Sequence, residues 1–294
     1  MKTSLDCIAC LVRQAAEAVK MSVSSDEERK RLMRNVLQWL GGVDFNQTPP
    51  AASQMIHRHL RECLSTHDPY RQAKDKQNDM AAELIPSIRR HIASSIDPLT
   101  MAVRYAIAGN IIDLGAKNKI GYGEIYADLQ SASMQPLYGD IEAFKKAVQK
   151  AKTILYLADN AGEIFFDRLL IEQLSGAEIT MAVRGAPVIN DATLADELAA
   201  GMDEIAEVID NGSDAPGTLL EDCSAEFRRR FDEADLVIAK GQGNFESLSD
   251  EQREIFFLFR TKCPTISRHS GFCIGTYVAA NRFAMPAYCS GANL

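Results

Sequence analysis

The sequence contains no run of 18 or more apolar residues, and it does not begin with a basic segment followed by an apolar one. We therefore expect neither a membrane-spanning helix nor a secretory signal. Basic residues are not in excess either: 32 Lys and Arg stand against 40 Asp and Glu, which gives a formal net charge of −8. Proteins that bind nucleic acid are usually basic, so no nucleic-acid partner is expected. A local basic pocket can still hold a small anionic substrate.

Disulfides are not needed to hold this chain together. Its seven cysteines are an odd number and scattered, and 294 residues are enough to build a hydrophobic core. Reduced thiols in a cytoplasm fit best. One Cys-x-x-Cys pair is present, Cys7 and Cys10, on a predicted helix where both thiols share a face. It is adequate for half of a metal site or for a redox pair, but no second pair completes a zinc site, and two small buried side chains are the competing interpretation.

Internal repeats and low-complexity linkers are also absent, so we expect the two halves of the chain to pack together. Residues 1–150 read as a helical domain, with apolar residues at helical spacing and capped starts. Residues 151–294 alternate strand and helix, which predicts a Rossmann-like α/β domain with a mostly parallel sheet and helices on both faces. The predicted strands are 153–158, 178–183, 205–209, 236–239 and 256–261.

The organising stretch is the turn after the first of these strands. An apolar run ends at Asp159 and Asn160, passes through small residues, and continues at Glu163 into a segment with helical spacing. An acid and an amide at such a turn offer the hard oxygen ligands that suit Mg²⁺ or Mn²⁺. The alternative is that Asn160 only caps the helix, with Glu163 completing a capping box.

The carboxyl ends of parallel strands meet at one edge of a sheet, so the residues after each predicted strand are expected to gather there. Asp191 follows the second strand and would add a third oxygen ligand to Asp159 and Asn160. Arg184 and Lys240 would add positive charge, and glycine-flanked amides would add N–H donors. Metal, cations and N–H groups together are what a phosphoryl group requires. The candidate substrate-binding residues are Glu163, Arg184, Gly185, Gly241, Asn244, Asn110 and Asp113.

Each of these residues has a structural alternative. Asp191 alone is as often a helix N-cap as a metal ligand. The segment Lys240–Asn244 resembles a phosphate loop but lacks the full spacing of the glycine-rich fingerprints. Gly109, Asn110 and Asp113 interrupt an apolar helix, either as a lid facing the site or as a packing glycine with a satisfied core amide.

Taken in order, these motifs resemble those of the metal-dependent damage-control phosphatases, formerly a domain of unknown function, and of their stand-alone subfamily I with an N-terminal Cys-x-x-Cys. The resemblance covers essentially the whole chain, with Asp159-Asn-Ala-Gly-Glu163 as its most distinctive motif. It implies a helical domain on a Rossmann-like domain and a divalent metal on Asp159, Asn160 and Asp191. It also implies hydrolysis of phosphate monoesters, often sugar phosphates or damaged phosphometabolites.

The predicted function is hydrolysis by a metal-activated water, with Asp159, Asn160, Asp191 and Lys240 as the catalytic set. The metal would be Mg²⁺ or Mn²⁺, with Co²⁺ and Ni²⁺ as further candidates. An aspartyl-phosphate on Asp159 is the alternative route. The expected partner is a small phosphorylated metabolite, with no membrane and no protein partner. Alternative functions are an S-adenosylmethionine-dependent methyltransferase, disfavoured because the second strand ends in Arg184, and a non-catalytic metal-binding or redox-sensing protein.

Overall fold

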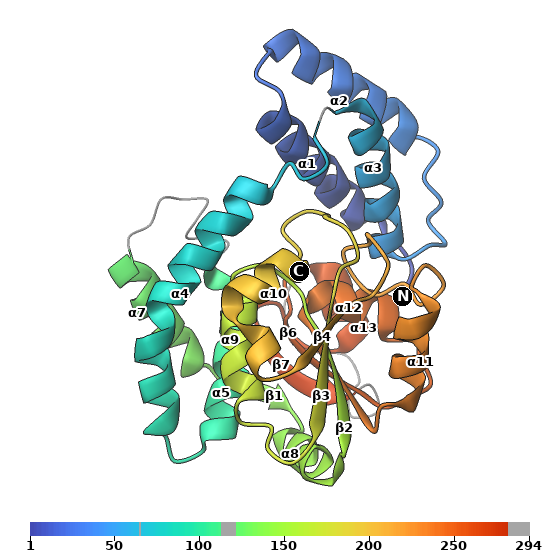
Figure 1. Ribbon diagram of the computed structural model, residues 1–294. Helices are drawn as coiled ribbons and strands as arrows, with labels where there is room; N and C mark the ends of the chain where they lie inside the picture. The colour runs from blue at the N-terminus through green and yellow to red at the C-terminus, as the bar shows by residue number, and fades with distance from the viewer. Residues whose placement is uncertain (65, 113–121, 282–294) are drawn as a thin grey trace.

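The structure is a computed structural model in which residues 1–64, 66–112 and 122–281 are described. Its first three helices form what we call the helical unit: α1 (Leu5–Ser22), α2 (Asp26–Leu40) and α3 (Pro49–Cys63). Their apolar faces close over one core. Ser25 and Thr48 cap α2 and α3, because the side chain of each accepts a backbone N–H of the first turn. The helical unit lies above the rest of the molecule in Figure 1.

Among the described residues, four more helices lie between the helical unit and β2 (Thr153–Leu157). They are α4 (Arg71–Ala93), α5 (Pro98–Ala108), α7 (Tyr122–Ser133) and α8 (Ile141–Lys150). Asp97 and Asp140 cap α5 and α8, and α5 ends at Ala108 with Gly109 as its C-cap. In the described part of the chain, no helix has the length and apolar character needed to cross a membrane.

Seven strands form one sheet in the order β1-β7-β6-β5-β2-β3-β4. All neighbours pair in parallel except β6 and β7. The strands are β1 (Leu137–Gly139), β2 (Thr153–Leu157), β3 (Glu178–Val183), β4 (Glu207–Asp210), β5 (Leu236–Lys240), β6 (Ile255–Arg260) and β7 (Tyr277–Asn281). The helices between them are α9 (Glu163–Ile171), α10 (Leu194–Ala200), α11 (Ala225–Glu233), α12 (Gly241–Leu248) and α13 (Pro264–Ser270), with a 3₁₀ turn at Met202–Glu204.

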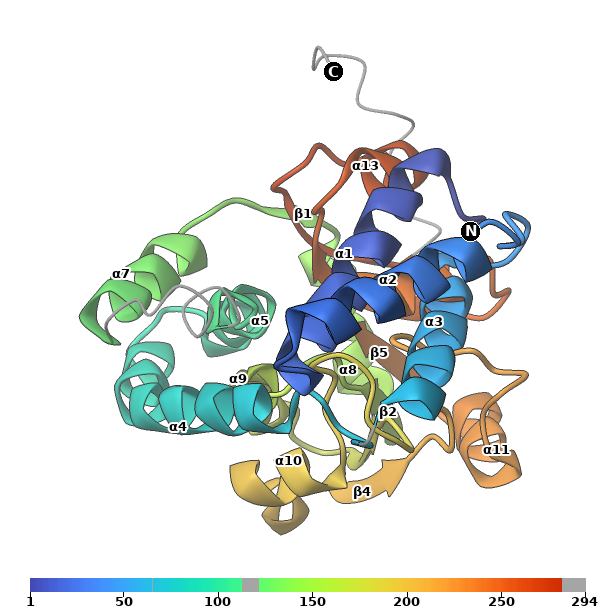
Figure 2. The same cartoon turned by 90° about the horizontal axis from the view of Figure 1, so that it is seen from above.

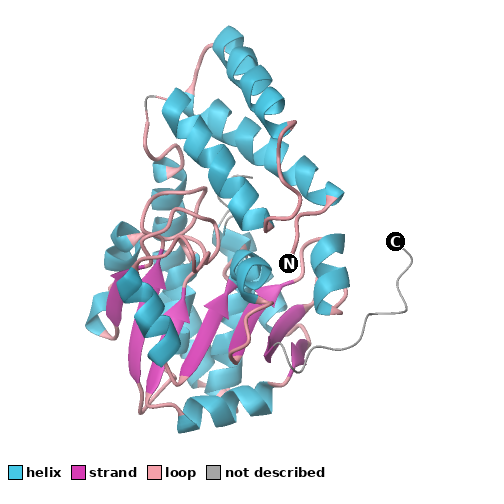
Figure 3. Ribbon diagram, turned by 90° about the vertical axis from the view of Figure 1, so that its right-hand side faces the viewer, coloured by secondary structure: helices cyan, strands magenta, loops and turns pink. Residues whose placement is uncertain are grey.

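Alternate residues of the buried strands face opposite sides of the sheet, as the period of two requires. Ile154 and Tyr156 face the core shared with α4, α5, α8 and α9, whereas Leu155 and Leu157 face the core shared with α11, α12 and α13. Figures 1 and 3 show the twisted sheet between these two layers, and Figure 2 shows the helical unit lying across its upper edge. The predicted α/β class is therefore confirmed.

The five predicted strands are present within two residues at each end, but β1 and β7 are not predicted from the sequence. β1 has three residues, too few to show a periodicity. β7 follows a short helix and runs antiparallel to β6, so it does not continue the alternating β/α pattern. The division of the chain at residue 150 stays a prediction. The helical unit has its own core, while α4 to α8 share a core with the sheet.

Polar contacts tie the helical unit to the sheet part. Gln54 of α3 donates to Asp214 at 2.7 Å, and Arg58 donates to the same carboxylate at 2.9 Å. At the start of the chain, the Ser4 and Thr265 hydroxyls are 2.8 Å apart. His57 lies in this interface fully buried, and burial together with the nearby charge of Arg61 lowers its pKa to about 4.

His57 makes the fold sensitive to acid. Because its pKa is about 4 when folded and about 6.5 when unfolded, the unfolded chain binds the proton more readily. The free energy of unfolding should therefore contain the full contribution of neutral His57 above pH 6.5. It should fall as the pH drops toward 4, by at most about 3 kcal/mol from this residue. Urea unfolding at pH 7.5 and pH 5 should show a smaller difference for His57→Gln than for the wild type. Equal differences would contradict this assignment.

Candidate active site

The topology reverses between β2 and β5, so the carboxyl ends of these two strands flank the point where open α/β sheets bind ligands. β2 leads into Asp159 and Asn160, and β5 ends at Lys240, with Gly241 beginning α12. The side chains of Asp159, Asn160 and Lys240 are all buried. The sequence prediction that these residues share one edge is thus met by the sheet itself.

Neither capping alternative describes Asn160 or Asp191. α9 begins at Glu163 with Gly162 as its N-cap, and the Asn160 side chain instead donates to Asp159 at 2.9 Å and to Glu163 at 2.7 Å. α10 is capped by Thr193, whose N–H and hydroxyl donate to Asp196. Asn160 and Asp191 are therefore available for another role.

Backbone pairing brings Asp191 to the β2 turn. Asn160 and Asp191 form an isolated antiparallel bridge. The N–H of Ala161 donates to the Asn190 carbonyl at 2.9 Å, and the N–H of Ala192 donates to the Asp159 carbonyl at 2.9 Å. These bonds join two segments that lie about thirty positions apart in the sequence. The three predicted metal ligands consequently lie together.

The Asp159 carboxylate sits against the backbone of Gly241. A Cβ placed on Gly241 would lie 1.9 Å from Asp159 Oδ2, and the φ of Gly241 is +79°, which side chains rarely adopt. Only glycine allows the carboxylate and the start of α12 to approach this closely. The N-terminus of a helix carries partial positive charge, so an anion is favoured there.

Negative charge is concentrated in this site. Burial, with the nearby carboxylates of Glu163 and Asp191, raises the pKa of Asp159 well above its ordinary value. Burial also raises the pKa of Asp191, although Arg184 Nε, 2.7 Å from its carboxylate, acts in the opposite direction. Two buried acids that disfavour each other's ionisation are the environment that a divalent cation stabilises.

The donor chemistry of these three residues fits such a cation. The nitrogen of the Asn160 amide is occupied by Asp159 and Glu163, which leaves its oxygen as the ligand atom, and Arg184 occupies only one oxygen of Asp191. In the part of the chain that the structure describes, no group of three or more His, Cys, Asp or Glu side chains is arranged to hold a metal. The predicted ligand set contains only two such side chains, Asp159 and Asp191, because its third member is the amide of Asn160.

Lys240 is held inside the protein. Its ammonium donates to Asp167 at 2.7 Å and lies 3.6 Å from Glu163. Burial acts to lower the pKa of Lys240, but the charges of Asp167 and Glu163 outweigh it and raise this pKa. Tyr156 also donates to Asp167, at 2.8 Å. Lys240 therefore neutralises the acids behind Asp159, and its predicted contact with substrate stays a prediction.

The other predicted substrate-binding residues support the site in different ways. Asn110 donates to Glu163, which agrees with a segment that faces the site. Gly109 permits close packing on Phe166, which agrees with the alternative of a packing glycine. Asn244 is buried, where it donates to Ala158 and Lys240 carbonyls and accepts from Arg184. The N–H of Gly185 is used by Ser213 and Asn211. Asp113 lies outside the described residues.

Comparison with known proteins identifies the family. The model of the damage-control phosphatase ARMT1-like domain matches residues 3–278. The chain belongs to this family.

Two damage-control phosphatases match this chain over nearly their whole length. It is 34% identical to a damage-control phosphatase of Pyrococcus horikoshii, over 91% of this chain and 94% of that protein. It is 33% identical to a damage-control phosphatase of Archaeoglobus fulgidus, over 95% of this chain and 99% of that protein. The crystal structure of a DUF89 family protein from Pyrococcus horikoshii has a TM-score of 0.90 and 33% identity, over 96% of this chain and 99% of that one. The predicted family is confirmed, and these relationships support a phosphatase role.

Lys262 directly follows the last predicted strand, 256–261, at the same edge of the sheet, but no role in binding is predicted for it from the sequence. Lys262 follows β6, lines a small pocket with Asp159, Glu163 and Gly241, and is exposed. Its charge acts to lower the pKa of Asp159. Its position after a strand of the same edge was the available signal, but sequence alone does not distinguish an exposed lysine from a buried one.

The Cys7–Cys10 pair lies on α1, away from the Asp159 turn in sequence. The Ser4 hydroxyl is 3.5 Å from Cys7 Sγ, and Arg13 donates to Cys10 Sγ at 3.4 Å. Cys7, Cys10, Cys63, Cys223 and Cys263 are free, as expected for reduced thiols. A metal or redox role of Cys7 and Cys10 stays a prediction.

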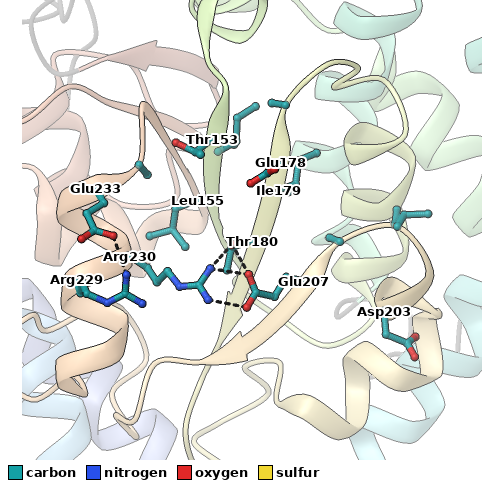
Figure 4. A pocket seen from close by; sticks show the side chains of 15 residues that line it. Thr153, Leu155, Glu178, Ile179, Thr180, Asp203, Glu207, Arg229, Arg230 and Glu233 are labelled. Atoms are coloured by element: carbon teal, nitrogen blue, oxygen red, sulfur yellow. Dashed lines mark hydrogen bonds and ion pairs between the residues drawn. The ribbon is translucent and has the colours of Figure 1, made fainter.

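A larger hollow lies at the opposite end of the strands and is not a second anion site. Its wall includes Thr153 and Glu178, the first residues of β2 and β3. As Figure 4 shows, the Arg230 guanidinium in this hollow is paired with Glu207, at 2.6 and 2.7 Å. Arg229 is likewise bonded to Glu233. Both guanidinium groups in the wall are already neutralised by acids.

The contact between Gly241 and Asp159 gives a stability prediction. Gly241→Ala should cost about 3 kcal/mol, because it combines a positive φ with overpacking against a carboxylate. Gly176→Ala is the matched control: φ is +93°, but nothing lies within 4 Å of the new methyl, so about 1 kcal/mol is expected. Chemical denaturation measures both. Equal losses for the two variants would mean that the Asp159 contact is not tight.

Proposed function

We propose that the protein is a metal-dependent phosphatase that hydrolyses phosphate monoesters of small metabolites, such as sugar phosphates or damaged phosphometabolites, by means of a metal-activated water. The observation that carries this proposal is the pair of buried acids, Asp159 and Asp191, joined through the bridge at Asn160 at the switch point of the sheet. Burial raises the pKa values of both acids, and a divalent cation between them would act in the opposite direction and favour their ionised forms.

Asp159, Asn160 and Asp191 would hold the cation, since carboxylate and amide oxygens suit Mg²⁺ or Mn²⁺. Bound there, the cation would supply charge for a phosphate oxygen and lower the pKa of a water toward neutrality. The protein's own contribution is orientation. Arg184 fixes Asp191 through one oxygen, and Asp159 and Glu163 fix the Asn160 amide through its nitrogen. These second contacts are the kind on which metal affinity depends.

The anionic end of a substrate would meet positive charge at the same pocket. Lys262 is exposed there, and the N-terminus of α12 begins at Gly241. Lys240 would act from behind by keeping Glu163 in place through their 3.6 Å ion pair. Positive charge at this pocket would therefore come from exposed side chains, Lys262 and Arg260, and from fixed backbone dipoles.

Neither alternative function has comparable support. A nucleoside cofactor of the methyltransferase type needs an acid at the end of the second strand of its domain, whereas β3 is followed by Arg184, which is paired with Asp191. A sensing role for Cys7 and Cys10 has only the Cys-x-x-Cys spacing behind it, because the contacts of these thiols are to Ser4 and Arg13.

The metal centre is tested by conservative replacement of its acids. Phosphate release from a panel of sugar phosphates and nucleotides should require added Mg²⁺, Mn²⁺, Co²⁺ or Ni²⁺. Asp159→Asn and Asp191→Asn should each lower kcat/KM by at least about a hundredfold, or ~2.7 kcal/mol, because each removes a charged ligand. The exposed acid Asp203 gives the control Asp203→Asn, which should retain activity. Full activity in Asp159→Asn would reject the centre.

Lys262 gives a separate prediction about substrate binding. Lys262→Met should raise KM about tenfold with little change in kcat, because it removes an attraction present in both the ground state and the transition state. Steady-state kinetics at low and high salt measure this, and the wild-type KM should rise with salt more than that of the variant. Lys152→Met, a change of another exposed lysine, is the control. An unchanged KM would place the phosphate elsewhere.

A further inference from the structure

The segment Pro187–Asp191 contains an unusual backbone. Ile189 has a φ of +44°, and among the residues that the structure describes it is the only one other than glycine with a positive φ. This region is unfavourable for a β-branched side chain, because Cβ crowds the backbone. Such a conformation persists only where the surroundings impose it, and it is typical of functional sites. Ile189 lies two positions before Asp191.

The helical unit imposes this conformation. The Ile189 side chain packs against the core of α1, α2 and α3. It shares the wall of a small cavity with Ala18, His57, Leu60 and Tyr70. One further contact fixes the start of the segment: Arg61 of α3 donates to the Pro187 carbonyl at 3.0 Å. Arg61 is itself paired with the Asp214 carboxylate.

The other side of the segment is bonded to the active site. The N–H of Asp191 donates to the Val188 carbonyl at 3.0 Å, which closes a tight turn around Ile189. Asn190 and Ala192 then pair with Ala161 and Asp159 as described above. The segment is therefore held from two sides: the Ile189 side chain packs in the helical unit, and the backbone from Asn190 to Ala192 is bonded to the β2 turn.

We infer that Ile189 is a positioning residue, through which the helical unit holds Asp191 in place beside Asp159. The effect of Ile189 on metal binding rests on the proposed function. Its effect on the backbone at Asp191 is independent of that function. The side chain serves as an anchor: packing in the helical unit offsets the unfavourable φ, and that φ turns the chain so that Asp191 meets Asn160. This gives the helical unit a direct role at a site to which none of its three helices contributes a predicted ligand.

The test is Ile189→Ala, which removes the anchor, with Ile8→Ala as the matched control. Ile8 is the same residue type and is also partly buried against the core of the helical unit, but it does not line the cavity. Hydrogen exchange of the metal-free protein is the first measurement. Amide exchange at Asp191 and Ala192 should become at least about tenfold faster in Ile189→Ala and stay at the wild-type rate in Ile8→Ala.

Binding of Mn²⁺ without substrate is the second measurement, followed by electron paramagnetic resonance or calorimetry. Ile189→Ala should bind Mn²⁺ about tenfold more weakly, the effect usual for residues that orient a metal ligand. Ile8→Ala should bind like the wild type. Unchanged exchange and unchanged Mn²⁺ affinity in Ile189→Ala would overturn the inference. If the wild type itself binds no Mn²⁺, the proposed function fails, while hydrogen exchange still decides the positioning role.

Two more substitutions complete the test. Ile189→Gly separates the packing of the side chain from the strain of the backbone, and Ile189→Val replaces Ile189→Ala if that variant does not fold. Ile189→Gly tolerates the positive φ but has no anchor, so it should melt at or above the temperature of Ile189→Ala and bind Mn²⁺ no more tightly. Tighter binding by Ile189→Gly would show that the backbone conformation suffices without the anchor, and would refute the inference. Should Ile189→Ala fail to fold, Ile189→Val, which removes one methyl group, is expected to show the same changes in smaller measure.

Discussion

The structure depends on the burial of like charge at the carboxyl edge of the sheet. Asp159 and Asp191 lie in protein interior at the switch point between β2 and β5, and each disfavours ionisation of the other. An arrangement of this kind costs free energy unless positive charge compensates it. Arg184, the start of α12 and the exposed Lys262 supply part of that compensation, and a divalent cation would supply more.

The charges around this edge fall into an inner and an outer set. The inner set joins Lys240, Asp167, Glu163 and Tyr156 in a closed network without an exposed member. The outer set, around Asp159, opens into the pocket that Lys262 lines. The inner network keeps the turn residues in fixed positions, and it reaches the pocket through Glu163 and Lys240, which line it together with Asp159 and Lys262. Preorganisation of this type is what hydrolytic sites require.

The helical unit is joined to this edge by more than general packing. Its own core is separate from the two that cover the sheet, yet one apolar side chain from the sheet part, Ile189, packs against it. Around that side chain, α3 also reaches the 187–222 region through Arg61, Arg58 and Gln54. A substitution in the helical unit can therefore affect the site through the backbone of one loop, without contact with the ligand.

The α/β class, five strands and the edge on which Asp159, Asn160, Asp191 and Lys240 lie could all be predicted from the sequence, because they follow from local periodicity and from the rule that parallel strands end together. The family was predicted separately, from the resemblance of its ordered motifs. The inward direction of Lys240 toward Asp167, the exposure of Lys262, and the fact that Asn160 and Asp191 are not helix caps emerge only in the folded protein. The tertiary structure also decided the strained turn at Ile189 and the approach of Gly241 to Asp159. Such features arise from contacts between segments far apart in the chain, and no local pattern of residues encodes them.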